Sequence, residues 1–431
     1  MGATLPVMTP PDPVYTNLRR ARVAWCLYDW ANSAFPTVIV TFVFSAYFAT
    51  AVAADKTAGT AQWSRALAIS GIVIALFSPI LGAIADSTGR RKPWLAACSG
   101  ITIVSAGLLW FARPDAEFVL YALMVFTLAN ISFEIGQVFY NAMLPGLVPA
   151  ERIGRVSGWG WGLGYAGGLC CLLIALFGFV QGNPLPFGLD KEDAEHVRIV
   201  GPMVAIWFAV FCLPLFLFVP DGGRSTLLMK ASIFNGVKTL ISTLRRVREY
   251  RTIAWFLVAR FFYVDGMNTM FAFGGIYAAG TFGMTLVEVI QFGIALNVSA
   301  GLGAAAFAWI DDRIGAKKTI AIALTGLIAL AIPLLLVEEK LWFMIVGVPL
   351  GIFMGPAQAA SRSLMARLAP PDLRTEMFGL FAFSGKATAF LGPFILGTVT
   401  LAMESQRAGM ATIVVFLGVG AIVLIWKVRD E

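Results

Sequence analysis

Charged residues, histidine and paired cysteines are scarce in this sequence of 431 residues. Charged side chains make up 13% of the chain, against roughly 25% in soluble domains, so a soluble globular protein is excluded. The single histidine, His196, lies in an acidic segment, and no two of the five cysteines have a C-x-x-C spacing. We therefore expect no disulfide framework, no metal site and no cofactor.

Enzyme motifs are also missing. The segment most similar to a phosphate-binding loop runs from Gly379 to Gly385-Lys386-Ala387. Its spacing is one residue too long, and Ala387 cannot bind magnesium as a serine or threonine would. The sequence predicts that the protein is not an enzyme, and that any work it does is driven by gradients.

Long apolar runs are what the chain has instead: 58% of its residues are hydrophobic and its mean hydropathy is +0.80. Runs that approach about 20 residues span a bilayer, where they must be helical to satisfy their backbone hydrogen bonds. The first run is too long for a signal peptide. We predict an all-α membrane protein with twelve spans, at about 23–53, 62–86, 93–112, 117–143, 154–180, 199–219, 251–279, 285–310, 317–337, 341–366, 375–401 and 408–427.

The basic residues are distributed unevenly between the two sides of these spans. Of the 32 lysines and arginines, 23 fall on the side of the N-terminus, 7 on the other side, and Arg260 and Lys386 inside helices. Basic loops stay cytoplasmic, so both termini are predicted to be cytoplasmic, in a multi-pass protein of the cell's inner (plasma) membrane. The net charge of +7 then reflects orientation and attraction to lipid headgroups, and no nucleic-acid partner is expected.

Two loops repeat along the chain. Gly82-x-x-x-Asp86-x-x-Gly89-Arg90-Arg91 matches Ala308-x-x-x-Asp312-Arg313-x-Gly315 at an offset of 226, and Pro149 with Gly158 matches Pro370 with Gly379 at an offset of 221. This predicts two six-helix bundles, residues 1–219 and 251–431. Residues 220–250 join them as a cytoplasmic linker whose stretch 227–250 is amphipathic and lies on the membrane surface.

The repeated Asp-x-x-Gly loops resemble the hallmark loop of the major facilitator superfamily. The resemblance implies that Gly82, Asp86, Gly89, Arg90, Arg91, Asp312, Arg313 and Gly315 form gates that latch the cytoplasmic side when the transporter faces outward. Asp86 can accept hydrogen bonds from a helix N-terminus or pair with Arg90 or Arg91. The alternative is a basic loop that only sets orientation. In the second copy Ala308 replaces the first glycine, so the helices there can pack less closely.

A closer resemblance covers most of the chain. It rests on the strings Tyr28–Phe35 (YDWANSAF), Asn141-Ala142-x-Leu144-Pro145, the glycines from Gly158 to Gly168, Phe378-Gly379-Leu380, 384–388 (SGKAT) and Gly392-Pro393. These are similar to the family of vacuolar amino-acid effluxers named from autophagy. The resemblance implies a transporter, with an amino acid as the favoured solute, and by default a monomer.

Charges inside a bilayer are costly and indicate function. They fall on predicted helices one (Asp29), four (Glu134), seven (Arg260, Asp265) and eleven (Lys386). Asn130, Glu134, Gln137 and Asn141 lie within about 60° of one another on a helix. Other polar residues expected in the cavity are Asn32, Asn268 and Gln358.

A carboxyl group in low-dielectric surroundings binds protons more readily than one in water. Glu134, Asp29 and Asp265 are therefore proton-coupling candidates, and Arg260 and Lys386 neutralise them or hold a substrate carboxylate. The alternative is a set of structural ion pairs, and Asp29 can also serve only as a gate. The glycines of helix five serve packing.

We therefore predict a secondary transporter of a small polar solute, coupled to a proton or another ion. One alternative is an exporter of a hydrophobic or sugar-like compound. Another is a membrane scaffold or sensor, which would not need the polar stripe of helix four.

Overall fold

The computed structural model describes residues 18–429 apart from 183–184, 222–235, 237, 244, 246–247 and 388, and apart from the side chains of 286 and 287. These residues form helices joined by short turns, without a β-strand in the described ranges. The all-α prediction is confirmed. Most of the predicted amphipathic stretch 227–250 lies outside the described residues.

The helices fall into two groups along the chain. The N-terminal group contains α1 (Arg19–Asn32), α2 (Phe44–Tyr47), α3 (Lys56–Thr88), α4 (Lys92–Leu108), α5 (Val119–Met143), α6 (Ile153–Leu173), α7 (Glu195–Arg198) and α8 (Val200–Phe218). The C-terminal group contains α10 (Arg251–Phe282), α11 (Leu286–Ile314), α12 (Ala316–Leu336), α13 (Lys340–Gly347), α14 (Leu350–Leu368), α15 (Arg374–Lys386), α16 (Leu391–Ala402) and α17 (Gln406–Lys427).

Eleven helical stretches of the described chain are long and apolar enough to cross a membrane. The predicted span that is not among the eleven is the seventh, α10, which has 32 residues. Its middle carries Arg260 and Asp265, and these charges lower its hydropathy. A helix of this length still spans a bilayer when its charged residues face the protein interior.

Several of the predicted spans are not regular α-helices from end to end, and the first and the eleventh bear on the site. The first changes from α-helix to π-helix near Pro36 (η2, Phe35–Phe42), since proline has no N–H to continue the hydrogen-bond ladder. The eleventh is divided into α15, which ends at Lys386, and α16, which begins at Leu391. This division places Lys386 at a helix end.

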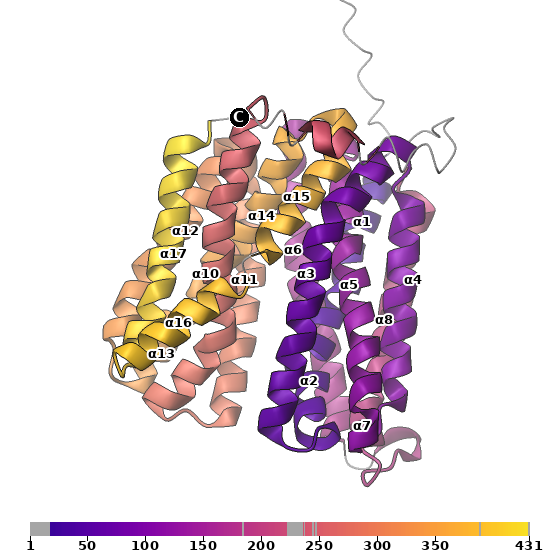
Figure 1. The fold of residues 1–431 in the computed structure, drawn as a ribbon, viewed down its shortest axis with the longest axis vertical. Helices are drawn as coiled ribbons and strands as arrows, with labels where there is room; N and C mark the ends of the chain where they lie inside the picture. The colour runs from indigo at the N-terminus through magenta and orange to yellow at the C-terminus, as the bar shows by residue number, and fades with distance from the viewer. Residues whose placement is uncertain are drawn as a thin grey trace, which may run out of the picture.

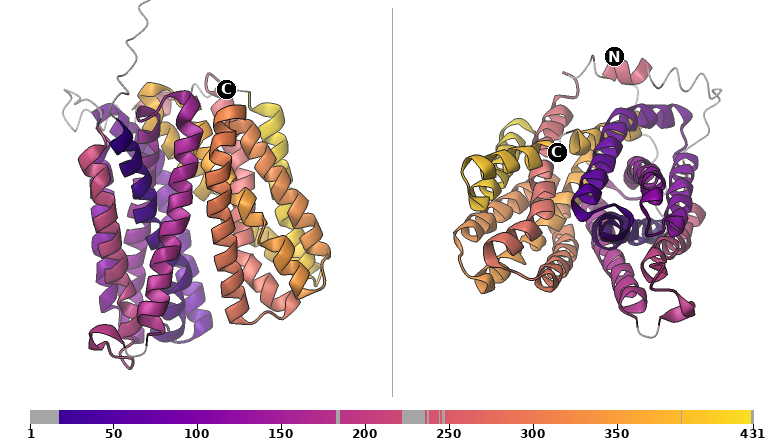
Figure 2. Two further views of the ribbon diagram at one scale, coloured as in Figure 1. Left: turned by 180° about the vertical axis from the view of Figure 1, so that it is seen from behind. Right: turned by 60° about the horizontal axis from the view of Figure 1, so that its bottom comes forward.

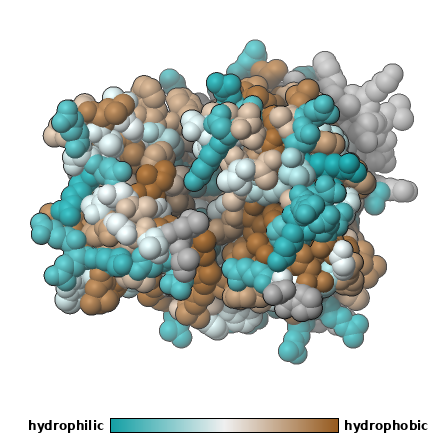
Figure 3. Space-filling view, turned by 90° about the horizontal axis from the view of Figure 1, so that it is seen from below, coloured by the Kyte–Doolittle hydropathy of each residue, from teal (hydrophilic) through white to brown (hydrophobic). Residues whose placement is uncertain are grey.

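The two groups stand side by side and converge at one end only (Figures 1 and 2). We call it the closed end: it is the end where α1 begins and α17 ends, and there α3 packs against α15 and α6 against α11. Toward the opposite end the groups separate, and a view from that side shows the surface hollowed between them (Figure 3).

Candidate functional site

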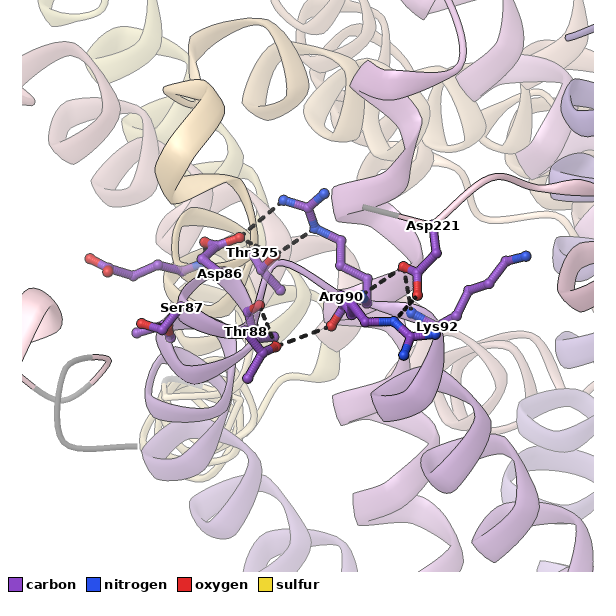
Figure 4. A network of polar contacts seen from close by, with 11 residues as sticks. Asp86, Ser87, Thr88, Arg90, Lys92, Asp221 and Thr375 are labelled. Atoms are coloured by element: carbon purple, nitrogen blue, oxygen red, sulfur yellow. Dashed lines mark hydrogen bonds and ion pairs between the residues drawn. The ribbon is translucent and has the colours of Figure 1, made fainter. Parts of the chain in front are cut away.

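Asp86, near the end of α3, joins the two groups at the closed end (Figure 4). Its carboxylate accepts hydrogen bonds from Arg91 Nη2 at 3.0 Å, from Thr375 Oγ1 at 2.5 Å and from the Glu376 backbone N–H at 2.9 Å. Thr375 and Glu376 lie in the first turn of α15, where free N–H groups and the helix dipole favour an anion. The carboxylate therefore caps a helix of the other group.

Asp312, near the end of α11, makes the equivalent contact in the opposite direction. Its Oδ1 accepts from the Arg155 backbone N–H at 3.0 Å, and its Oδ2 pairs with Arg155 Nε at 3.3 Å. Arg155 is the third residue of α6, as Glu376 is the third residue of α15. Both predicted loops thus bind the same position of a helix from the other group.

The preceding residue, Asp311, is buried beside this contact. It accepts from Arg367 Nη1 at 2.7 Å and from Ser363 Oγ at 2.5 Å, both on α14. Arg367 Nη2 also lies 3.7 Å from Asp312 Oδ1. Asp311 and Asp312 therefore connect α11 to α14 and, across the groups, to α6.

Glycines allow the helices to approach this closely. A Cβ atom at Gly82 would overlap the carbonyl of Thr375, and one at Gly379 would lie 2.5 Å from the carbonyl oxygen of Ser78. A Cβ atom at Gly158 would lie 2.6 Å from both the carbonyl oxygen of Ala304 and the Cβ of Ala308. Substitution of any of these glycines would force the helices apart at the closed end.

The remaining residues of the two predicted gating loops lie in different environments. Gly89 and Gly315 adopt positive φ angles of 70° and 89°, which glycine adopts without strain. Arg91 is the partner of Asp86, whereas Arg90 Nε donates to Asp221 at 3.2 Å. Arg313 is exposed.

Arg362 of α14 is the most extensively bonded charge between the groups, and it is 3% exposed. Its guanidinium donates to Asp29 Oδ2 at 2.9 Å, to Ser157 Oγ at 2.9 Å, to the Ser157 carbonyl at 2.6 Å and to Asn141 Oδ1 at 3.4 Å. Its carbon Cζ also lies 4.7 Å from the ring centre of Trp25. Three helices of the N-terminal group therefore hold one side chain of the C-terminal group.

Glu134 and Lys386 form a second ion pair between the groups. Lys386 Nζ lies 2.6 Å from Glu134 Oε1, and the two side chains remain 31% and 25% exposed. Along their helices they lie about 14–18 Å from the closed end at 1.5 Å per residue. The pair is thus deep between the groups and still accessible.

Arg260 lies near this pair without forming an ion pair in the described part of the chain. Its Nη1 donates to the Phe381 carbonyl at 2.6 Å and to Ser384 Oγ at 2.8 Å, and its Cζ lies 3.5 Å from the centre of the Phe381 ring. All of these partners are on α15. Arg260 therefore holds the last turns of α15, where Lys386 stands.

The other residues expected in the cavity do not form one cluster. Gln358 Oε1 accepts from Tyr165 Oη at 2.7 Å across the groups. Asn130 and Asn32 are buried, the latter with an unbonded Nδ2, and Gln137 is partly buried. Asn141 joins the Arg362 cluster.

Asp265 and Asn268 were both expected in the cavity from predicted helix seven, but their environments differ. Asp265 is 1% exposed and accepts from the Gly392 backbone N–H at 2.8 Å. It therefore caps α16 just after the break. Asn268 is exposed, although the two positions lie only about 60° apart around the helix axis.

Sequence reasoning missed several residues of these clusters. Arg367 had been counted only among the basic residues that set orientation, and Arg362 had been placed near the inner end of predicted helix ten without a partner. Both extend from α14 toward the other group. Ser157 gave no signal, since a hydroxyl in a glycine-rich helix has no distinctive spacing. The adjacent pair Asp311-Asp312 at the end of an apolar helix was the one signal that could have been used.

Comparison with known proteins gives consistent matches over this architecture. The family described as "Vacuole effluxer Atg22 like" matches residues 64–431. A Bacillus subtilis protein named "Uncharacterized MFS-type transporter YxiO" is 29% identical over 409 residues, which is 93% of each chain. "Autophagy-related protein 22" of Pichia angusta is 24% identical over 398 residues, covering 79% of this chain and 70% of that protein.

Solved structures show the same fold at low identity. The major facilitator transporter FucP in its outward conformation has a TM-score of 0.75 at 14% identity, over 97% of this chain and 100% of its own. The proton:xylose symporter XylE has a TM-score of 0.73 at 11% identity, over 96% of each chain. At such identities the likeness establishes the fold, and it supplies the twelve-helix architecture that the sequence predicted.

Proposed function

Because this chain belongs to the Atg22-like family of vacuole effluxers, we propose that it carries a small zwitterionic solute, an amino acid, across a membrane. It is a multi-pass transporter of the major facilitator type and not an enzyme. The observation that carries the proposal is the Glu134–Lys386 pair, whose opposite charges come from the two groups and stay partly exposed.

An amino acid carries the same two charges as this pair. Its ammonium group is suited to Glu134 and its carboxylate to Lys386. Binding would exchange one ion pair for two, so no buried charge would be left without a partner. Arg260 would hold the end of α15 in place through Ser384 and Phe381, so that Lys386 keeps its position.

We propose that transport proceeds by alternating access between two rigid bodies, residues 1–219 and 251–431, joined by 220–250. The closed end is cytoplasmic in this proposal, since the basic loops lie there, and the described state faces outward. Opening the closed end would break the Asp86, Asp312 and Arg362 contacts. Glu134, Asp29 and Asp265 are the candidates for a coupling proton.

Reconstitution into proteoliposomes with a panel of amino acids, sugars and hydrophobic compounds tests the substrate. We expect amino-acid uptake, and we expect Lys386→Gln and Glu134→Gln each to weaken it by about thirtyfold, since losing a charged partner costs about 2 kcal/mol or more. Lys340→Gln is the matched control, because Lys340 forms a pair of the same length with Glu288 in an exposed position. Wild-type uptake by Lys386→Gln, or transport of a sugar alone, would contradict the proposal.

A pH-sensitive dye inside the same vesicles tests the coupling. We expect solute flux to change the internal pH, and we expect Glu134→Gln or Asp265→Asn to reduce that change. An unchanged internal pH, together with normal transport by both variants, would show that these carboxyl groups do not couple a proton.

A further inference from the structure

Glu376 is a fully buried carboxyl group at the closed end, and the proposed transport mechanism does not use it. It is the third residue of α15 and its exposed fraction is 0%. Within the part of the chain that the structure describes, neither of its carboxyl oxygens has a hydrogen-bond partner. Its backbone N–H, by contrast, donates to Asp86 Oδ2 at 2.9 Å.

Among the described residues, no positive charge forms an ion pair with Glu376. Asp86 of α3 is the charged neighbour that acts on it, and it has the same sign. Arg91 is bonded to Asp86 and Thr375 instead, and Arg374 of the same helix forms no ion pair with Glu376 among the described residues. The buried Thr243 hydroxyl lies near the carboxyl group without a hydrogen bond of ordinary geometry.

Glu376 is enclosed by parts of the molecule that separate when the closed end opens. Its Cα lies 3.1 Å from the position of a Cβ on Gly82 of α3, in the other group. Thr243 belongs to the segment that connects the two groups, and in that segment Gly236 packs against the backbone of Ile84 on α3. Separation of α3 from α15 would therefore admit water to the carboxyl group.

The position equivalent to Glu376 in the N-terminal group carries a basic residue and not a carboxyl group. Subtracting the repeat offset of 221 from 376 gives Arg155, also the third residue of its helix. Arg155 pairs with Asp312 and its side chain is 37% exposed. One interface therefore combines opposite charges, whereas the other places two carboxyl groups together.

An ionised carboxylate buried without a partner is strongly unfavourable, and in practice such a group takes up a proton. We propose that Glu376 is a proton-binding site that must be occupied for the closed end to form, and that it releases its proton to the compartment on that side when the end opens. The release step rests on the alternating access proposed above. The requirement for a proton in the closed state rests on the geometry alone.

Hydrogen exchange of the purified protein, without any solute, tests this requirement. Amides of the first turn of α15 are protected only while the end is closed, because the Glu376 N–H is bonded to Asp86. As pH rises, the ionised form accumulates and the closed state loses stability. We expect the protection of wild type relative to Glu376→Gln at the same pH to fall, by up to about tenfold per pH unit for one proton.

Glu117→Gln is the matched control, since Glu117 is exposed and precedes α5 away from the closed end. It is expected to keep the wild-type pH dependence. Equal pH dependence in wild type and Glu376→Gln would overturn the proposal.

Infrared spectroscopy gives a second measurement that does not depend on opening. The protonated carboxylic acid band at neutral pH should be reduced in Glu376→Gln and unchanged in Glu117→Gln. A full band in Glu376→Gln would show that Glu376 is ionised in the closed state. Neither measurement involves a solute, so a failure of the amino-acid proposal would leave both results standing.

Discussion

At the scale of single residues, Arg362 has the largest set of contacts across the two groups. Its guanidinium donates four hydrogen bonds to oxygens of Asp29, Ser157 and Asn141, and aromatic rings lie close to it. A buried ion pair of this kind contributes little net stability compared with apolar packing, but it is costly to break on one side only. The cluster therefore acts as an all-or-none contact.

Removing one partner of the Asp29–Arg362 pair tests this interpretation. Asp29→Asn or Arg362→Met alone leaves a buried group without its counter-charge, which costs about 3–5 kcal/mol. The double variant removes both charges, so its loss of thermal stability in detergent should be smaller than the sum of the single losses. Additive losses would show that Asp29 and Arg362 do not stabilise each other.

Glu134 and Lys386 differ from that pair in exposure, and exposure decides their proposed role. Side chains that are a quarter to a third exposed can exchange partners with a solute. Arg362 and Asp29, which are buried by protein on all sides, can separate only if the groups move. An ion pair between the groups thus indicates solute binding where it is exposed, at Glu134 and Lys386, and gating where it is buried, at Asp29 and Arg362.

At the scale of elements, the packing of α3 on α15 and of α6 on α11 decides which end is closed. Each contact has a glycine where a Cβ would meet backbone atoms of the other group. Ala308 takes the place of the first glycine in the second loop, as the sequence showed, yet α6 and α11 still meet. Gly158 of α6 provides the space, since it faces Ala308.

An alanine at Gly82 should shift the molecule toward opening at the closed end. Its Cβ would overlap the Thr375 carbonyl, and overpacking of this kind costs about 1–3 kcal/mol. We expect a cysteine probe at the closed end to react faster with a water-soluble thiol reagent in Gly82→Ala. Gly71→Ala is the matched control on the same helix, because no atom lies within 4 Å of its Cβ position. Equal reactivity of the two variants would mean that α3 and α15 adjust without opening.

The division between α15 and α16 is a second feature of this scale. Asp265 of α10 caps the first turn of α16 through Gly392, while Arg260 of the same helix holds α15. One helix therefore supports both sides of the break. Its two charges lower the hydropathy of α10, so that it is not among the eleven most apolar long helices.

At the scale of the whole molecule, the repeat seen in the sequence relates two bonds between the groups. Asp86 bonds to the N–H of Glu376, and Asp312 bonds to the N–H of Arg155. Asp86 and Asp312 are separated by the offset of 226, and Arg155 and Glu376 by the offset of 221. Each half thus supplies one carboxylate and one helix N-terminus.

If the two groups move as rigid bodies, loss of one bond must weaken both interfaces. Asp86→Asn removes the charge that caps α15. We expect hydrogen exchange to become faster both in the first turn of α15 and in the first turn of α6, with Arg155, which Asp86 does not contact. Faster exchange confined to α15 would show that the two interfaces open independently.

The sequence by itself determined the fold class, the number of spans and the repeat. Bilayer thickness sets the length of an apolar helix, and the cost of an unpaired backbone group in lipid leaves the helix as the only form for these runs. It also identified Asp29, Glu134, Asp265, Arg260 and Lys386, because a charge within an apolar run stands out without any knowledge of its neighbours.

The tertiary structure decided which of these charges meet and at which end the groups converge. Glu134 and Lys386 are 252 positions apart and Asp29 and Arg362 are 333 apart, and no local pattern specifies contacts across such separations. Burial is also a property of the packed helices. Glu376 lies in the first turn of α15, where the sequence is typical of a polar helix start. Only the packing of α3 and the connecting segment over this turn excludes water from its carboxyl group.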